Sequence, residues 1–251
     1  MKRFNKFMGI ALATVMLVIT SLTPVLANEK RTFTTAEIDQ WIVGTSAILN
    51  YNNHEISNLF TADLTPAVRQ RVESTSRQIL TGNSWNIQNR QDLLDQVEIM
   101  TEFGHNSNFW DDVYFLIPIM TSPNGIEDLM RSVEVGLVDI DTAIHLVETW
   151  DIAMHWGEAG IMAWDLFRVG NLLVWGYHAG FITRDEAREL MVPAAELLYE
   201  NFDSWEEAAA NYLDGLLYWR GAADDEFFNR VDVVEGMFER NDPVFNNSLF
   251  E

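Results

Sequence analysis

Residues 161–180 read IMAWDLFRVGNLLVWGYHAG, and this stretch decides the fold class. The spacing predicts a helix with apolar side chains on every face, and a helix that is apolar all round is buried. Four long polar side chains interrupt it. At about 100° per residue they fall within one sector of roughly 140°: Asp165, Arg168, Asn171 and His178. We therefore expect a buried central helix near residues 161–180 that carries one polar stripe.

The rest of the chain shows mostly helical patterns. The capping-box spacing, in which Ser or Thr is followed three residues later by Glu, occurs at Thr34, Thr183 and Ser204. The best strand candidate is residues 113–120, although Pro118 lies inside it. We predict an all-α fold, a single globular domain of about eight to ten helices.

The first segment has the pattern of a secretory signal. Lys2, Arg3 and Lys6 precede an apolar run over residues 8–22, and small side chains near residue 27 suit a cleavage site. We predict a signal peptide over residues 1–27, cleavage after Ala27, and a secreted or periplasmic domain over residues 28–251. An uncleaved membrane anchor is the alternative, but the apolar run is short for a bilayer-spanning helix.

Composition excludes several classes of protein. The chain has 251 residues, 48% of them hydrophobic, which excludes a disordered protein. It has no Cys, and therefore neither disulfides nor a thiolate metal site. Its 38 acidic residues against 16 Lys and Arg give a net charge of −22, so we expect no nucleic-acid binding.

Asp165 and Arg168 count against a membrane span over residues 161–180, because charged side chains are costly inside a bilayer, and we expect no membrane span in the mature chain.

The polar stripe has two interpretations. In the first, Asp165 and Arg168 form a structural ion pair with each other or with other helices, because an unpaired buried charge is costly. In the second, the stripe lines a ligand pocket in which Arg168 meets an anion and two indoles form flat walls. The candidate ligand-binding residues are then Trp164, Asp165, Arg168, Asn171, Trp175 and His178.

Other possible sites are weaker. Asp151, His155 and Glu158 share one helical face and are weak metal-ligand candidates, without the His-Glu-x-x-His pattern of zinc hydrolases. His105 follows Gly104 at a predicted helix end, where capping of the last carbonyls is favoured over catalysis. The chain has neither a Gly-x-Ser-x-Gly elbow nor a glycine-rich phosphate loop, so we expect no cofactor.

Several motifs in order resemble the bacterial domain-of-unknown-function 1266 (DUF1266) family over roughly residues 78–221. They are Trp85-x-Ile87, Asp92-Leu93-Leu94, Gly104-His105, Ala163-Trp164-Asp165-Leu166-x-Arg168, Gly176-Tyr177-x-x-Gly180-Phe181-Ile182, Glu186-Ala187, Ser204-Trp205-Glu206-Glu207 and Gly215-x-x-x-Trp219. The resemblance implies a mostly helical domain, and it supplies neither an activity nor catalytic residues. Leu216 departs from the family pattern, which has Arg at that place.

Two functional hypotheses follow. The first is a non-catalytic module of the cell envelope that binds a protein partner or has a structural role, since catalytic signatures are missing and aromatic residues are abundant. The second is an enzyme or small-ligand receptor whose pocket surrounds Trp164, Asp165 and Arg168. A packed Arg168 with no adjoining space favours the first hypothesis, and an Arg168 that reaches open space favours the second.

Overall fold

The computed structural model describes residues 31–51 and 60–250. The chain divides into two units, Met1–Thr32 and Phe33–Glu251, and the fold described below is that of the second. The predicted signal peptide, residues 1–27, lies outside the described residues, so it stays a prediction.

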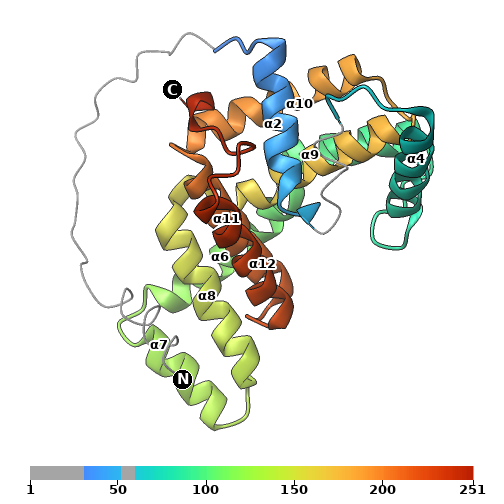
Figure 1. Cartoon of the computed structure of the whole chain (residues 1–251). Coiled ribbons are helices and arrows are strands. Elements are labelled where there is room, and N and C mark those ends of the chain that lie inside the picture. Colours follow the sequence, from blue (N-terminus) through green and yellow to red (C-terminus); the bar gives the residue numbers. More distant parts are fainter. Residues whose placement is uncertain (1–30, 52–59, 251) are drawn as a thin grey trace. The chain divides into compact units, whose positions relative to one another are not determined.

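The described residues form ten α-helices and two short 3₁₀ helices, without a strand, and this confirms the predicted all-α class. Figure 1 shows how the helices are arranged. The α-helices are α2 (Thr35–Ala47), α4 (Pro66–Thr81), α5 (Arg90–Glu102), α6 (Gly104–Met120), α7 (Gly125–Glu134), α8 (Ile140–Trp156), α9 (Met162–His178), α10 (Arg184–Asn201), α11 (Trp205–Arg220) and α12 (Asp225–Glu239). The 3₁₀ helices are η2 (Gly157–Ala159) and η3 (Asn247–Leu249).

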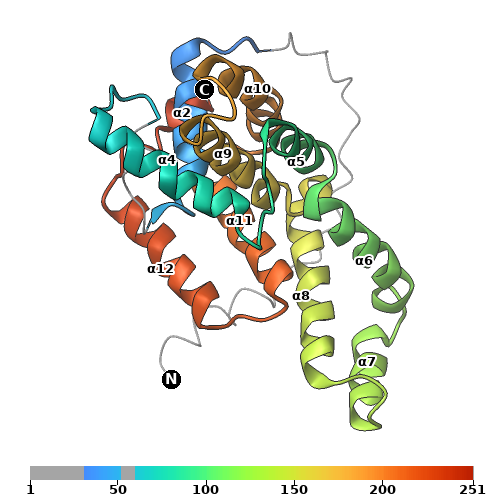
Figure 2. The same ribbon diagram turned by 90° about the vertical axis from the view of Figure 1, so that its right-hand side faces the viewer.

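Helix α9 is the centre of the packing, as the apolar stretch predicts. It lies among α2, α4, α5, α6, α10 and α11 and contacts each of them (Figure 2). Of its 17 residues, 14 are buried. Gly170 permits the close approach of α2, because a Cβ there would lie 2.0 Å from Thr45 Oγ1. Within the described part of the chain, no helix has the length and apolarity needed to cross a membrane.

The strand candidate at residues 113–120 was wrong, because these residues form the second half of α6. The buried side chains Phe109, Val113 and Leu116 are spaced four and three residues apart, which is helical spacing. Pro118 lies in the last turn of the helix, which ends at Met120. Burial of one helical face therefore prevails over the local β-propensity of the Val, Tyr, Phe and Ile residues.

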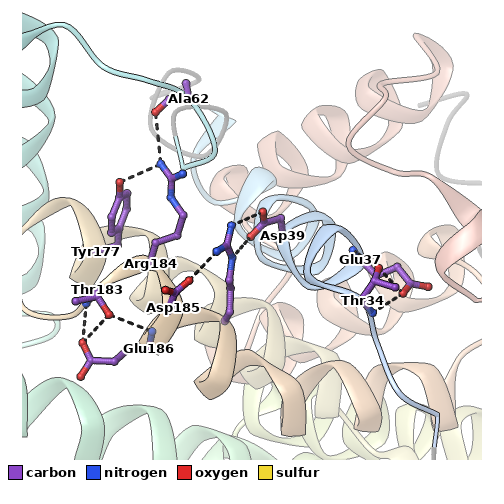
Figure 3. Close-up of polar contacts among 10 residues, drawn as sticks. Thr34, Glu37, Asp39, Ala62, Tyr177, Thr183, Arg184, Asp185 and Glu186 are labelled. Carbon is purple, nitrogen blue, oxygen red and sulfur yellow. Dashed lines mark hydrogen bonds and ion pairs between the residues drawn. The ribbon is translucent and has the colours of Figure 1, made fainter.

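Two of the predicted capping boxes are present, and they lie near an ion pair that joins α2 to α10 (Figure 3). Thr34 begins α2 with Glu37, and Thr183 begins α10 with Glu186. Arg188 of α10 donates two hydrogen bonds of 2.8 Å to the carboxylate of Asp39 on α2. The hydrogen bonds to Asp39 favour the charged form of the guanidinium and raise the pKa of Arg188. A charged, bidentate contact therefore joins the two helices.

Candidate functional site

Asp165, in the first turn of α9, caps a different helix. Its Oδ2 accepts a hydrogen bond of 2.9 Å from the backbone N–H of Asn106, in the first turn of α6. The N-cap residue of α6, Phe103, supplies no side-chain cap of its own. The buried carboxylate therefore satisfies an otherwise unpaired donor and complements the helix dipole. Gly104 leaves room for it, since a Cβ there would lie 2.3 Å from Asp165 Oδ2.

Arg168 lies one turn further along α9, in contact with two indoles. Its guanidinium carbon is 4.8 Å from the ring centre of Trp164 and 5.0 Å from that of Trp85. Its Nη1 lies 3.7 Å from Asp165 Oδ1, which is an ion pair but too long for a hydrogen bond. Burial lowers the pKa of Arg168, and the Asp165 charge opposes this shift. The predicted Asp165–Arg168 pair is thus present, with the cation incompletely neutralised.

His105 completes this cluster. Its Nδ1 lies 3.0 Å from Arg168 Nη1 and 3.1 Å from Asp165 Oδ1. One ring nitrogen cannot accept from Arg168 and donate to Asp165 at the same time. Nδ1 of His105 therefore either donates to Asp165 or accepts from Arg168, and the tautomer of the ring decides which. We expected His105 to cap the end of the preceding helix, whereas the structure places its ring against Asp165 and Arg168.

Asn171, further along the predicted stripe, belongs to a different hydrogen-bond network. Asn50 donates to Asn171 Oδ1 at 2.9 Å and accepts from the indole Nε1 of Trp175 at 3.1 Å. Asn171 also donates to the backbone carbonyl of Phe167. His178 is buried next to the ring of Tyr177. The structure therefore brings Trp164, Asp165 and Arg168 together, while Asn171 and Trp175 serve the packing of residue 50 against α9.

Sequence reasoning missed several residues that build the Arg168 cluster. Trp85 stacks on Arg168, and its ring also meets the edge of Trp175 at 5.8 Å. The side chains of Asn106 and Asn211 hold the turn before α9: Asn106 accepts from the N–H of Ile161, while Asn211 accepts from Ala163 and donates to the carbonyl of Gly160. Trp85 and His105 occur in the family-like motifs, which was the available signal, whereas Asn106 and Asn211 had none.

The weak metal candidates do not meet. Helix α8 ends at Trp156, and Gly157, with φ of 53°, turns the chain so that Glu158 lies in η2. Among the described residues, no three His, Asp or Glu side chains are grouped closely enough to hold a metal ion. A polar hollow of ≈ 400 Å³ lies elsewhere, and its lining includes Glu206, Asn241, Asp242 and Asn246. None of the predicted ligand-binding residues lines this hollow.

A second notable surface is the arm, which we define as residues 104–156 with helices α6, α7 and α8. Helix α7 packs on α6 and α8 at the end distant from α9 (Figure 2). Ten of the fourteen exposed large hydrophobic side chains of the described residues lie on the arm: Tyr114, Phe115, Ile117, Ile126, Met130, Val135, Leu137, Ile140, Ile144 and Met154. The arm also contains nine acidic residues and one Arg.

The comparisons with known proteins concern most of this helical domain. The match to a family of unknown function, DUF1266, covers residues 82–247. The match begins close to residue 78, where the resemblance was expected to begin. It ends beyond residue 221, where the resemblance was expected to end, so the match also includes α12. A relative, the uncharacterized protein YbeU of Escherichia coli (strain K12), is 30% identical over 141 residues.

That alignment covers 56% of this chain and 57% of YbeU, so the chain spans little more than half the length of this relative. No solved structure matches the chain. Because the family match extends over more than half of the residues, the chain belongs to the DUF1266 family of proteins of unknown function.

Proposed function

We propose that this protein is a non-catalytic binding module whose arm docks a cationic, amphipathic segment of another protein. The observation that supports this is the gathering of exposed apolar side chains on one part of the molecule. Phe115 is 67% exposed and Leu137 is 79% exposed. Exposed apolar surface that is concentrated in one region marks an interaction site more often than scattered residues do.

The acidic residues of the arm indicate the charge of the partner. Burial raises the pKa of Glu148, and the neighbouring charge of Asp151 raises it further. Burial also raises the pKa of Asp151. These partly desolvated carboxylates would be stabilised by a nearby Lys or Arg from a partner. A second copy of this acidic chain, nucleic acid or an anionic membrane would be repelled by the net charge of −22.

A peptide-binding measurement tests the docking proposal. The probes are a designed amphipathic Leu/Lys helix and a Leu/Glu helix of the same length, titrated calorimetrically into the full chain. We expect the Leu/Lys helix to bind and the Leu/Glu helix not to bind. Replacing Phe115 and Leu137 together by Ser should weaken binding at least about tenfold, because each buried apolar side chain contributes roughly 1.5–3 kcal/mol.

The matched control is Phe228→Ser, which removes an exposed Phe from α12, outside the arm. It should leave the affinity for the Leu/Lys helix unchanged. Equal binding of both peptides, or an equal loss of affinity in the control variant, would overturn the proposal. Binding of the wild-type arm to zwitterionic lipid vesicles in place of the peptide would assign this surface to a membrane and also overturn it.

We also infer that the module works outside the cytoplasm, in the cell envelope or beyond it. The support is the cationic start at Lys2 and Arg3 followed by the apolar run that ends near Ala27. N-terminal sequencing of the exported protein tests this inference. A mature chain that begins at Asn28 is expected, and a full-length chain confined to the cytoplasm would contradict it.

A further inference from the structure

The guanidinium of Arg168 has fewer hydrogen-bond partners than donors. Of its five N–H groups, only those on Nη1 lie within hydrogen-bond distance of another side chain among the described residues, at the Nδ1 of His105. The rings of Trp85 and Trp164 both lie against the guanidinium, at 5.0 and 4.8 Å from its carbon. The N–H groups of a guanidinium lie in its plane, so a further hydrogen-bond acceptor would bind in that plane. The side chain is 14% exposed, so solvent reaches part of it.

The residues that contact Arg168 include another donor without an acceptor. The Nε1 of Trp164 is buried and has no hydrogen-bond partner within the described structure. His105 has its proton on Nε2 when Nδ1 accepts from Arg168, and its side chain is 30% exposed. The nearby carboxylate, Asp165, already accepts from Asn106 and lies 3.7 Å from Arg168. The cluster therefore has an excess of donors around a desolvated cation, which favours an anionic acceptor.

We propose that Arg168 binds the carboxylate of a small organic acid that has an apolar body. The planar fork of the guanidinium matches a carboxylate in a bidentate arrangement. Next to it, the ring of Trp219 lies 5.7 Å from that of Trp164 and is half exposed, which provides apolar surface for the body of the ligand. This site is separate from the arm, and the proposal does not depend on the docking function.

The charge of the whole chain selects among oxyanions. A net charge of −22 repels every anion, and it repels a phosphate dianion more strongly than a singly charged carboxylate. The Arg168 site also has one guanidinium, whereas multiply charged ligands are usually met by several cations. A monocarboxylate is therefore the ligand class that fits both the local donors and the overall field.

Tryptophan fluorescence of the full chain, with calorimetry, tests this proposal with benzoate, acetate and inorganic phosphate as probes. Benzoate is expected to bind one to one and to change the indole emission. Acetate and phosphate should bind more weakly, acetate because it lacks the apolar ring. Arg168→Lys, which keeps the charge but loses the fork, should weaken benzoate at least about tenfold, equivalent to 1.4 kcal/mol.

Two further variants separate binding from folding. Trp219→Ser alters an exposed side chain and should weaken benzoate while leaving acetate unchanged. Arg77→Lys is the matched control, because Arg77 also stacks on a ring, that of Phe181, but is half exposed and paired with Glu73. It should leave benzoate affinity unaltered. Absence of benzoate binding, tighter binding of phosphate, or equal loss in the Arg77 variant would overturn the proposal.

Discussion

At the scale of single residues, burial decides what an ion pair does in this protein. Asp165–Arg168 and Asp128–Arg131 both pair residues three apart on one helix, at 3.7 and 3.3 Å. The first pair is buried and the second is exposed. An exposed pair contributes little, because water solvates both charges when they separate. When one partner of a buried pair is removed, the other is left as an uncompensated charge away from water, and the folded state is strongly destabilised.

We therefore expect Asp165→Ala to reduce the free energy of unfolding by roughly 3–5 kcal/mol, the cost of breaking a buried pair. The loss includes the unpaired N–H of Asn106 at the start of α6. The control Asp128→Ala should change stability by less than about 1 kcal/mol. Urea denaturation of both variants measures the difference. Similar losses of unfolding free energy in the two variants would show that the buried Asp165 carboxylate stabilises the fold no more than the exposed Asp128 carboxylate does.

Alanine substitution at Gly104 is a second test of the contact between α6 and Asp165. Gly104 and Gly136 both have positive φ, 51° and 72°, which disfavours any other residue. A Cβ at Gly104 would clash with the Asp165 carboxylate, whereas a Cβ at Gly136 would meet nothing within 4 Å. Gly136→Ala should cost about 1–2 kcal/mol for the left-handed backbone alone.

Gly104→Ala should cost clearly more, because the carboxylate must move and lose its hydrogen bond to Asn106. Thermal unfolding followed by circular dichroism compares the two variants under identical conditions. If the two alanine variants melt at the same temperature, the close approach of Gly104 to Asp165 does not contribute to stability.

At the scale of elements, helix starts are specified locally. In the capping box of α10, Glu186 accepts from the backbone N–H of Thr183 at 2.7 Å, and the Thr183 hydroxyl accepts from the N–H of Glu186. Arg90 of α5 also donates to Glu186, which links the two helices. The backbone bond to Thr183 and the Arg90 contact lower the pKa of Glu186 from 4.5 to about 2.

This pKa predicts an acid-sensitive contribution to stability. Glu186 stabilises the folded state above the unfolded pKa of 4.5, and the contribution is lost as the pH falls towards about 2. Glu186→Gln cannot titrate, so its stability should fall less steeply over that range. Unfolding free energies measured at several pH values test this. Glu189→Gln, at an exposed position of α10, controls for the lost charge and should retain the wild-type pH slope.

At the scale of the whole molecule, like charges oppose the compact state. The net charge is −22 and the isoelectric point is near 4.4. Added salt shortens the range of this repulsion, from about 30 Å at 0.01 M to about 8 Å at 0.15 M. We expect the melting temperature at pH 7.5 to rise with sodium chloride, and the rise to vanish near pH 4.4. A melting temperature lowered by salt at pH 7.5 would mean that ion pairs such as Arg188–Asp39 outweigh the repulsion.

The fold class and several boundaries were predictable because their causes are local or periodic. The apolar run around Trp164 predicts the buried α9, and the cap at Thr183 predicts where α10 begins. Residues 113–120 show the limit, since β-branched and aromatic residues are compatible with either conformation until one face is buried. There the tertiary contacts of Phe109 and Val113 decided for helix.

The sequence by itself determined that a helix near residues 161–180 is buried and that Asp165 and Arg168 share its polar stripe, because these follow from side-chain chemistry and a period of 3.6 residues. Only the tertiary structure decided that Trp85 and His105 meet Arg168, while Asn171 turns to Asn50 instead. His105 lies 63 residues from Arg168. Contacts over such a separation depend on how helices pack, and local propensity does not encode packing.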